Sequence, residues 1–230
     1  MAKQRFFVAG TDTDVGKTRV SAALLALAKQ QGLRSLGLKP VAAGCHIEEG
    51  ELRNEDALTL MEHSSVSISY AEVNPIAFEP PIAPHIAAAQ QERQLSADRI
   101  VAFSRGAMMN PADFVIVEGA GGWRVPLNHR ETLAEVPKQL SLPVILVVGM
   151  KLGCLSHALL TVEAIQRDGL ALAGWVANSI DPDMSCPDEN LATLQRMIPA
   201  PCLGVVPWLE ALTIEQVAEH LSLAPLINDH

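Results

Sequence analysis

The 230-residue chain carries 17 lysines and arginines against 26 aspartates and glutamates, which gives a net charge of −9 at pH 7. This balance excludes the basic surface that binding to nucleic acid or to an anionic membrane requires. Apolar residues make up 49% of the chain but aromatic residues only 4%, which favours a core of aliphatic strands covered by helices.

Length and apolar patterning predict one cytoplasmic domain. A chain of 230 residues can form a single large core, so we expect one domain over residues 1–230. No apolar run is long enough to span a bilayer, and the N-terminus lacks the pattern of a signal peptide. The four cysteines show no metal-ligand spacing, which favours reduced thiols.

Residues 10–18 read GTDTDVGKT and follow an apolar run at residues 5–9 that predicts a buried strand. After Thr18, apolar side chains recur at helical spacing, and Gly32 would end that helix. A strand, a glycine loop and a helix that starts with Gly-Lys-Thr form a phosphate-binding P-loop, because the N–H groups at the helix start attract anions. Lys17 would then neutralise nucleotide phosphates and the Thr18 hydroxyl would bind Mg²⁺.

The next two segments carry one charged residue each that points to the same site. Residues 35–38 predict a strand, and Lys39 follows it where ligands bind in open α/β sheets. A solvent-exposed lysine is the alternative. Residues 52–61 predict a helix that turns Leu52, Leu58 and Met61 inward and carries Asp56, either as a metal ligand or as a surface charge.

Proline residues are frequent between residues 73 and 84, which predicts a loop that forms a substrate wall before a short helix near His85. Residues 113–118 predict a buried strand that ends in Glu118, followed by glycines at 119, 121 and 122. A carboxylate at the end of a strand beside the P-loop strand can hold Mg²⁺ directly or through water.

The C-terminal half repeats the alternation of strand and helix. Strands are predicted at 142–149, 172–177 and 203–206, and helices at 155–167, within 182–198, and at 213–221. The helix start near Ser156 could bind a carboxylate, and Asn178 could recognise adenine with its amide. The fold class is therefore predicted as α/β: a single-domain P-loop NTPase fold with a mostly parallel sheet and helices on both faces.

Taken together, these segments resemble the dethiobiotin synthetase family over most of the chain. The matching stretches are residues 10–18, 39–42, 52–58, 84–85, 117–123, 151–154, 174–178 and 199–201. The resemblance implies a homodimer that converts 7,8-diaminononanoate, CO₂ and Mg-ATP into dethiobiotin, ADP and phosphate in biotin biosynthesis. It implies a carbamate and then a carbamic-phosphoric anhydride as intermediates, with no protein nucleophile.

The resemblance also assigns residues by analogy. The catalytic contacts to carbamate and phosphates fall on Thr13, Lys17 and Lys39. The Mg²⁺ ligands are Thr18, Asp56 and Glu118, and these three also count as nucleotide-binding residues. The other nucleotide contacts are Asp14, Val15, Gly16, Lys17, Asn178 and Pro207, of which the last two hold adenine. The substrate positions are Ala43, Gly153, Cys154 and Ser156. The five residues between Gly10 and Gly16, where the usual P-loop has four, match the family's own variant.

Three positions depart from the family pattern on the substrate side. The family often has serine where this chain has Ala43, asparagine where it has Ser156, and tyrosine near Asn190. We therefore expect weaker binding of the diamine. Two alternatives keep the fold: a related P-loop protein that acts as a nucleotide-binding regulator, and a ligase with altered diamine specificity. A membrane-cycling ATPase is disfavoured, because the loop lacks an early lysine and residues 213–230 are acidic.

Overall fold

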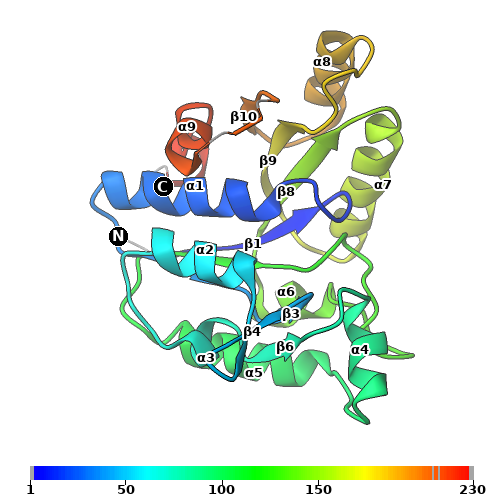
Figure 1. Cartoon of the computed structure of the whole chain (residues 1–230). Helices are drawn as coiled ribbons and strands as arrows, with labels where there is room; N and C mark the ends of the chain where they lie inside the picture. Colours follow the sequence, from blue (N-terminus) through cyan, green and yellow to red (C-terminus); the bar gives the residue numbers. More distant parts are fainter. Residues whose placement is uncertain (1–2, 209, 212, 228–230) are drawn as a thin grey trace.

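The computed structural model describes residues 3–208, 210–211 and 213–227, so the last three residues of the acidic stretch 213–230 lie outside the described residues. Within the described part, six parallel strands form the central sheet in the order β10-β9-β8-β1-β7-β2. They are β1 (Gln4–Gly10), β2 (Ser35–Leu38), β7 (Phe114–Glu118), β8 (Val144–Met150), β9 (Leu172–Ser179) and β10 (Cys202–Val206). This arrangement confirms the predicted parallel sheet (Figure 1).

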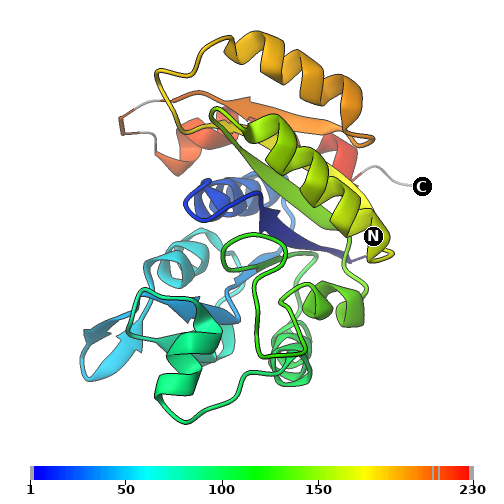
Figure 2. The ribbon, with the colours of Figure 1, turned by 90° about the vertical axis from the view of Figure 1, so that its right-hand side faces the viewer.

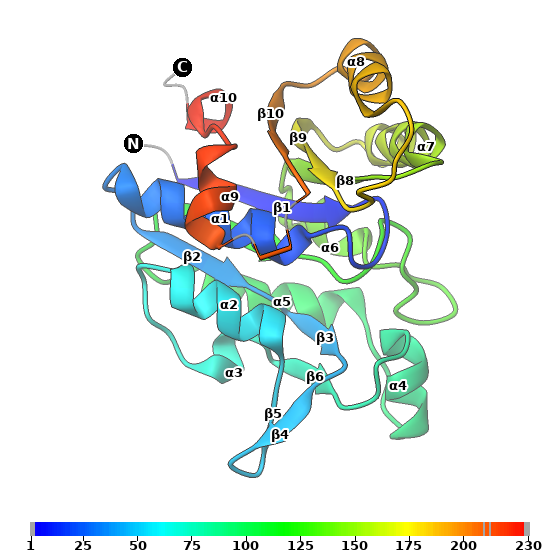
Figure 3. The same cartoon turned by 45° about the horizontal axis from the view of Figure 1, so that its top comes forward.

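Helices cover both faces of the sheet, because the strands present apolar side chains alternately to each face. Phe6 and Val8 of β1 pack into the cluster with α1 (Lys17–Gln30), α9 (Ile214–Glu219) and α10 (Ala224–Ile227), whereas Phe7 and Ala9 pack into the cluster with α5 (Ala97–Ala107), α6 (Glu135–Leu140) and α7 (Cys154–Arg167). Figures 1 and 3 show α1 and α9 on one side of the sheet and α5 and α6 on the other.

Smaller elements extend the domain beyond β2. Strands β3 (Val41–Ala43) and β6 (Ile76–Phe78) pair in parallel, and β4 (His46–Glu48) and β5 (Glu51–Arg53) form an antiparallel hairpin. Figures 2 and 3 show this hairpin at the opposite end of the molecule from α8 (Pro187–Met197). The remaining helices are α2 (Glu55–His63), α3 (Tyr70–Val73) and α4 (Pro84–Gln90). In the described residues, no helix combines the length and apolar character that crossing a membrane needs.

The predicted helix over residues 52–61 was wrong at its start. Leu52 belongs to β5, and α2 begins at Glu55 because the side chain of Asn54 accepts a hydrogen bond from the Ala57 N–H at 3.3 Å and caps the helix. The buried side chains of α2 are Ala57 and Leu60, whereas Leu58 and Met61 are half-buried. The one-turn shift leaves Asp56 in the first turn of α2, close to the cap.

The predicted loop over residues 73–84 contains the end of a helix and a short strand, which the frequent prolines made hard to predict. Val73 ends α3, and Ile76–Phe78 forms β6 against β3 before the prolines resume. The short helix near His85 is confirmed as α4, which starts at Pro84. Helices α5 and α6 were not predicted from the sequence.

Candidate functional site

The P-loop joins β1 to α1 and depends on glycine at both ends. A Cβ atom on Gly10 would lie 2.7 Å from Cγ2 of Val15, so a side chain there would displace the loop. Gly16 has a φ of +90°, which glycine adopts readily, and a Cβ there would collide with the amide of Asn178. Because Gly16 directly precedes α1, the unpaired N–H groups of the first helical turn face the open side of the loop.

Lys17 lies under this loop with its charge held close to the backbone. Its Nζ donates to the carbonyl oxygen of Asp12 at 2.9 Å, and the residue is buried. Burial, and then the nearby charge of Lys39, lower the pKa of Lys17 to about 8. A phosphate group bound beside Lys17 would stabilise its charged form and so counteract the lowering of its pKa by burial and by Lys39.

The sheet order brings Lys39 and Glu118 together. Strands β2 and β7 are neighbours in register Leu38↔Val117, so the next residue of each lies at the same carboxyl edge. Lys39 Nζ lies 2.6 Å from Glu118 Oε1 and 2.7 Å from Asp56 Oδ2, and Thr18 Oγ1 donates to the same Glu118 oxygen at 2.9 Å. The predicted solvent-exposed alternative for Lys39 is wrong, because only 4% of its side chain is exposed.

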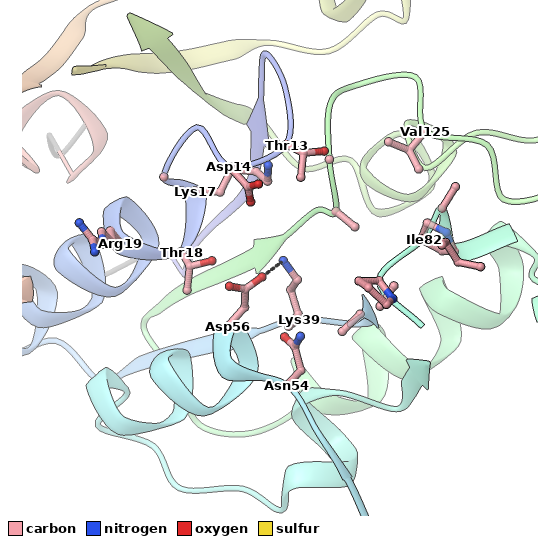
Figure 4. Close-up of a pocket in the computed structure, with 18 residues that line it drawn as sticks. Thr13, Asp14, Lys17, Thr18, Arg19, Lys39, Asn54, Asp56, Ile82 and Val125 are labelled. Atoms are coloured by element: carbon pink, nitrogen blue, oxygen red, sulfur yellow. Dashed lines mark ion pairs between the residues drawn. The ribbon is translucent and has the colours of Figure 1, made fainter. Parts of the chain in front are cut away.

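Charge pairing decides the ionisation of this cluster. Burial alone would lower the pKa of Lys39, but the carboxylates of Glu118 and Asp56 outweigh it and hold the pKa above its ordinary value. Burial likewise favours the neutral form of Asp56, but Lys39 reverses this and the pKa of Asp56 is lowered. Lys39 is therefore a charged ammonium held between two carboxylates. Figure 4 shows Lys39 directed at Asp56, with Thr18 and Lys17 on the facing elements.

The oxygen atoms around Lys39 are of the kind that bind Mg²⁺ together with the phosphates of a bound nucleotide. Thr18, Asp56 and Glu118 supply a hydroxyl and two carboxylates, and Mg²⁺ commonly takes one or two carboxylates together with substrate phosphates. Glu118 Oε2 is buried and has no hydrogen-bond partner among the described residues, so it retains an unused acceptor. In the described residues, no group of three His, Cys, Asp or Glu could hold a metal by itself.

Two cavities border the P-loop. The larger, of about 870 Å³, is lined by Thr13, Lys17, Thr18, Lys39 and Asp56 on one side and by Ala43, Pro81 and Pro84 on another. The proline-rich segment therefore forms one wall of this cavity, and its contact with a substrate stays a prediction. Glu118 and Val15 lie behind this surface, with Val15 fully buried under the loop.

The smaller cavity, of about 220 Å³, is lined by Asn178, Pro207 and Trp208 together with Asp14 and Gly16, which also line the larger one. Asn178 was predicted to recognise adenine with its amide. In the structure its Nδ2 donates to the Val15 carbonyl at 2.8 Å, so Asn178 holds the P-loop in place. Its contact with adenine stays a prediction.

Three predicted substrate residues lie away from both cavities. Gly153, with a φ of +96°, precedes α7, Cys154 is buried in its first turn and Ser156 is exposed. Asn190 donates its amide to Cys186 O at 2.8 Å on α8. Within one chain, therefore, the described structure brings Ala43 but none of these four residues to the cavity with Lys39.

A network of hydrogen bonds that was not predicted from the sequence connects the main chain of Lys39 to the start of α2. Tyr70 OH accepts from the Asn54 N–H at 2.8 Å and donates to Asn74 Oδ1 at 3.0 Å, and Asn74 Nδ2 donates to the Lys39 carbonyl at 2.6 Å. Asn54 caps the helix that carries Asp56. One tyrosine thus joins the main chain of Lys39 to the start of α2. The helix-cap pattern of Asn54 was the one available signal in the sequence.

Comparisons with known proteins agree with this architecture. Residues 4–216 match a family model described as an AAA domain. The septum site-determining protein MinD of Pyrococcus horikoshii, in complex with Mg-ADP, superimposes with a TM-score of 0.57 at 16% identity, covering 96% of this chain and 87% of that one. Chloroplast FtsY of Physcomitrella patens gives 0.50 at 18% identity, covering 95% and 65%. At these identities the likeness establishes the P-loop NTPase fold alone.

Sequence relatives identify the family more narrowly. An "ATP-dependent dethiobiotin synthetase BioD" of Cellvibrio japonicus is 58% identical and covers 99% of this chain and 100% of its own. Proteins of the same name from Marinobacter nauticus and Pseudomonas aeruginosa are 53% and 55% identical, covering 100% and 96% of this chain and 100% and 97% of their own. With more than half of the residues identical over nearly the full length, the chain belongs to the ATP-dependent dethiobiotin synthetase family.

Proposed function

We propose that this protein, acting as one domain over residues 1–230, closes the ureido ring of dethiobiotin from 7,8-diaminononanoate, CO₂ and ATP in biotin biosynthesis. The observation that carries the proposal is the meeting of Lys39, Asp56 and Glu118 with the P-loop residues Lys17 and Thr18 beside one cavity. Relatives more than 50% identical bear the name of this activity.

The chemistry needs cations rather than a protein nucleophile. One amine of the diamine adds to CO₂ and loses a proton, giving a carbamate. A carbamate oxygen then attacks the γ-phosphorus and ADP leaves, so that a carbamic-phosphoric anhydride forms. The second amine attacks the carbonyl carbon and loses a proton, phosphate leaves and the five-membered ring closes. Lys17 and Lys39 would stabilise the negative charge of carbamate and phosphates, and Thr13 lies on the same cavity wall to orient them.

We further propose that Thr18, Asp56 and Glu118 hold Mg²⁺, which supplies charge neutralisation at the β- and γ-phosphate oxygens when bound. The unused acceptor at Glu118 Oε2 and the partly exposed carboxylate of Asp56 support this role. Lys39 already occupies the position between the two carboxylates, so a cation that binds them competes with the Lys39 ammonium.

Gly153, Cys154, Ser156 and Asn190 line neither cavity of a single chain, so a substrate role for them would need a second protomer. We propose that the active form is a homodimer in which the start of α7 closes the substrate side of the partner's cavity. Ala43 lines that cavity without a hydrogen-bonding side chain, which agrees with weaker diamine binding. Cytoplasmic location and action without nucleic acid or membrane stay predictions from the sequence.

The test of the proposed function measures ADP release with Mg-ATP and bicarbonate, with and without 7,8-diaminononanoate. We expect ADP release to depend on the diamine and to match the formation of dethiobiotin. ATP hydrolysis that ignores the diamine would contradict the synthetase and favour the nucleotide-binding regulator. Turnover with a different diamine only would point to a ligase of altered specificity.

Tyr70→Phe should slow this reaction without weakening ATP binding, because it removes the hydroxyl that links Asn54 to Asn74 and leaves the ring in place. Hydrogen bonds of this kind contribute about 0.5–1.5 kcal/mol each, so we expect a kcat about 3- to 10-fold lower. Ser69→Ala is the matched control, since it removes the capping box of α3 without touching the link. Equal losses of kcat in both variants would reduce Tyr70 to a packing residue.

A further inference from the structure

Arg19 connects the two cavities. It is the third residue of α1, and together with Asp14 and Gly16 it lines both the larger and the smaller cavity. Figure 4 shows its side chain on the side of α1 away from Lys39 and Asp56, while Thr18 faces them. The two cavities that border the P-loop thus share one cationic side chain.

The guanidinium of Arg19 is available to a ligand. The side chain is exposed, and among the described residues no carboxylate lies within ion-pair distance of it. Other arginines of this chain are paired: Arg34 with Asp113 at 2.7 Å, and Arg124 with Asp168 at 2.7 Å. Neither the P-loop motif nor the family resemblance gave Arg19 a role.

The position of Arg19 between the two cavities indicates which part of a bound nucleotide it would contact. The proposed function places the terminal phosphates beside Lys17 and Thr18, which line the larger cavity. The family resemblance assigns the base to Asn178 and Pro207, and both of these line the smaller cavity. Between these ends a nucleotide has its α-phosphate and ribose. Of these, the phosphate is the chemical partner of a guanidinium, which donates two parallel hydrogen bonds to phosphate oxygens.

We propose that Arg19 binds the α-phosphate of the nucleotide and so sets the affinity for both ATP and ADP. This inference rests on the proposed function for the identity of the nucleotide. The α-phosphate does not react, so the contact is the same before and after phosphoryl transfer. An interaction of this kind changes KM for ATP and the inhibition constant for ADP, and leaves kcat for the chemical step unchanged.

The experiment compares AMP with adenosine by calorimetry, since the two ligands differ only in the α-phosphate. Wild-type protein should bind AMP more tightly, and Arg19→Ala should bring the affinity for AMP down to that for adenosine. We expect KM for ATP and the inhibition constant for ADP to rise together, about 5- to 20-fold. Arg19→Lys should give intermediate values, because it keeps the charge but not the planar pair of donors.

Lys29→Ala is the matched control, because it removes one exposed cation from the last turn of the same helix and lines neither cavity. Unchanged AMP affinity in Arg19→Ala, or an equal loss for adenosine, would overturn the assignment. The binding comparison needs no turnover. It therefore tests Arg19 even if the wild-type protein shows no diamine-dependent ADP release, the result that contradicts the proposed function.

Discussion

Lys39→Met is expected to lower the rate of dethiobiotin formation by about 10²–10³-fold or more, which is the usual cost of losing a group that stabilises charge in the transition state. Lys39 lines the larger cavity, to which the proposed function assigns the carbamate and the γ-phosphate, and it does not line the smaller cavity. ATP binding should therefore stay measurable while turnover is lost.

Product formation and calorimetric ATP binding together check this expectation. Lys29→Met, which removes an exposed lysine from α1, serves as the control for the loss of one positive charge. If Lys39→Met turned over at the wild-type rate, Lys39 would be only a structural counter-ion of Glu118. A parallel loss of ATP affinity and turnover would instead place it in ground-state nucleotide binding.

Lys39→Met should also destabilise the fold, and this effect can be measured separately from the loss of turnover. Glu118 is 1% exposed, and removing its ammonium partner leaves a buried carboxylate that costs about 3–5 kcal/mol. If the proposed Mg²⁺ site is correct, Mg²⁺ without nucleotide should restore part of this stability in Lys39→Met and do little in the wild type, where Lys39 already pairs with Asp56 and Glu118. Thermal unfolding at increasing Mg²⁺ concentration measures the difference.

The sequence predicted that the P-loop, Lys39 and Glu118 lie at one site because each of them is tied to a local pattern. Residues 10–18 follow a strand and start a helix, and Lys39 and Glu118 each close an apolar strand. In a parallel sheet the carboxyl ends of all strands lie at one edge. Because β1, β7 and β2 are neighbours in this sheet, the P-loop, Glu118 and Lys39 come together at that edge. The helical position of Asp56 was harder to predict, because the apolar spacing from Leu52 favoured an earlier helix start than the cap at Asn54 gives.

What the sequence could not predict depends on contacts between distant segments. Tyr70 and Asn74 support Lys39 through hydrogen bonds across 16 to 35 positions of the chain, and no local periodicity marks such partners. The hydrogen bond from Asn178 to Val15 was missed for the same reason, because it spans 163 positions of the chain. Ser156 was predicted from its place at a helix start and from the resemblance, and within a single chain it is exposed and lines neither cavity.

Glu118→Gln is expected to lower turnover by about 10²-fold or more, although glutamine keeps the shape of the side chain and one carbonyl oxygen. That oxygen can still accept from Thr18 and Lys39, so the positions of both can persist. What disappears is the negative charge that balances Lys39 and that a divalent cation would need. Turnover should fall at every Mg²⁺ concentration, and the concentration giving half-maximal rate should rise.

Combining the two substitutions tests whether Lys39 and Glu118 act as one charge pair. Each single variant leaves a buried charge with fewer partners, whereas Lys39→Met with Glu118→Gln removes both charges and should unfold at a temperature closer to the wild type than Lys39→Met does. The double variant should nevertheless remain inactive. A coupling free energy of about 0.5–3 kcal/mol from the four unfolding curves would fit residues in direct contact. Additive losses of stability would mean that the pair is not coupled, and the competition between Lys39 and Mg²⁺ would then lack its physical basis.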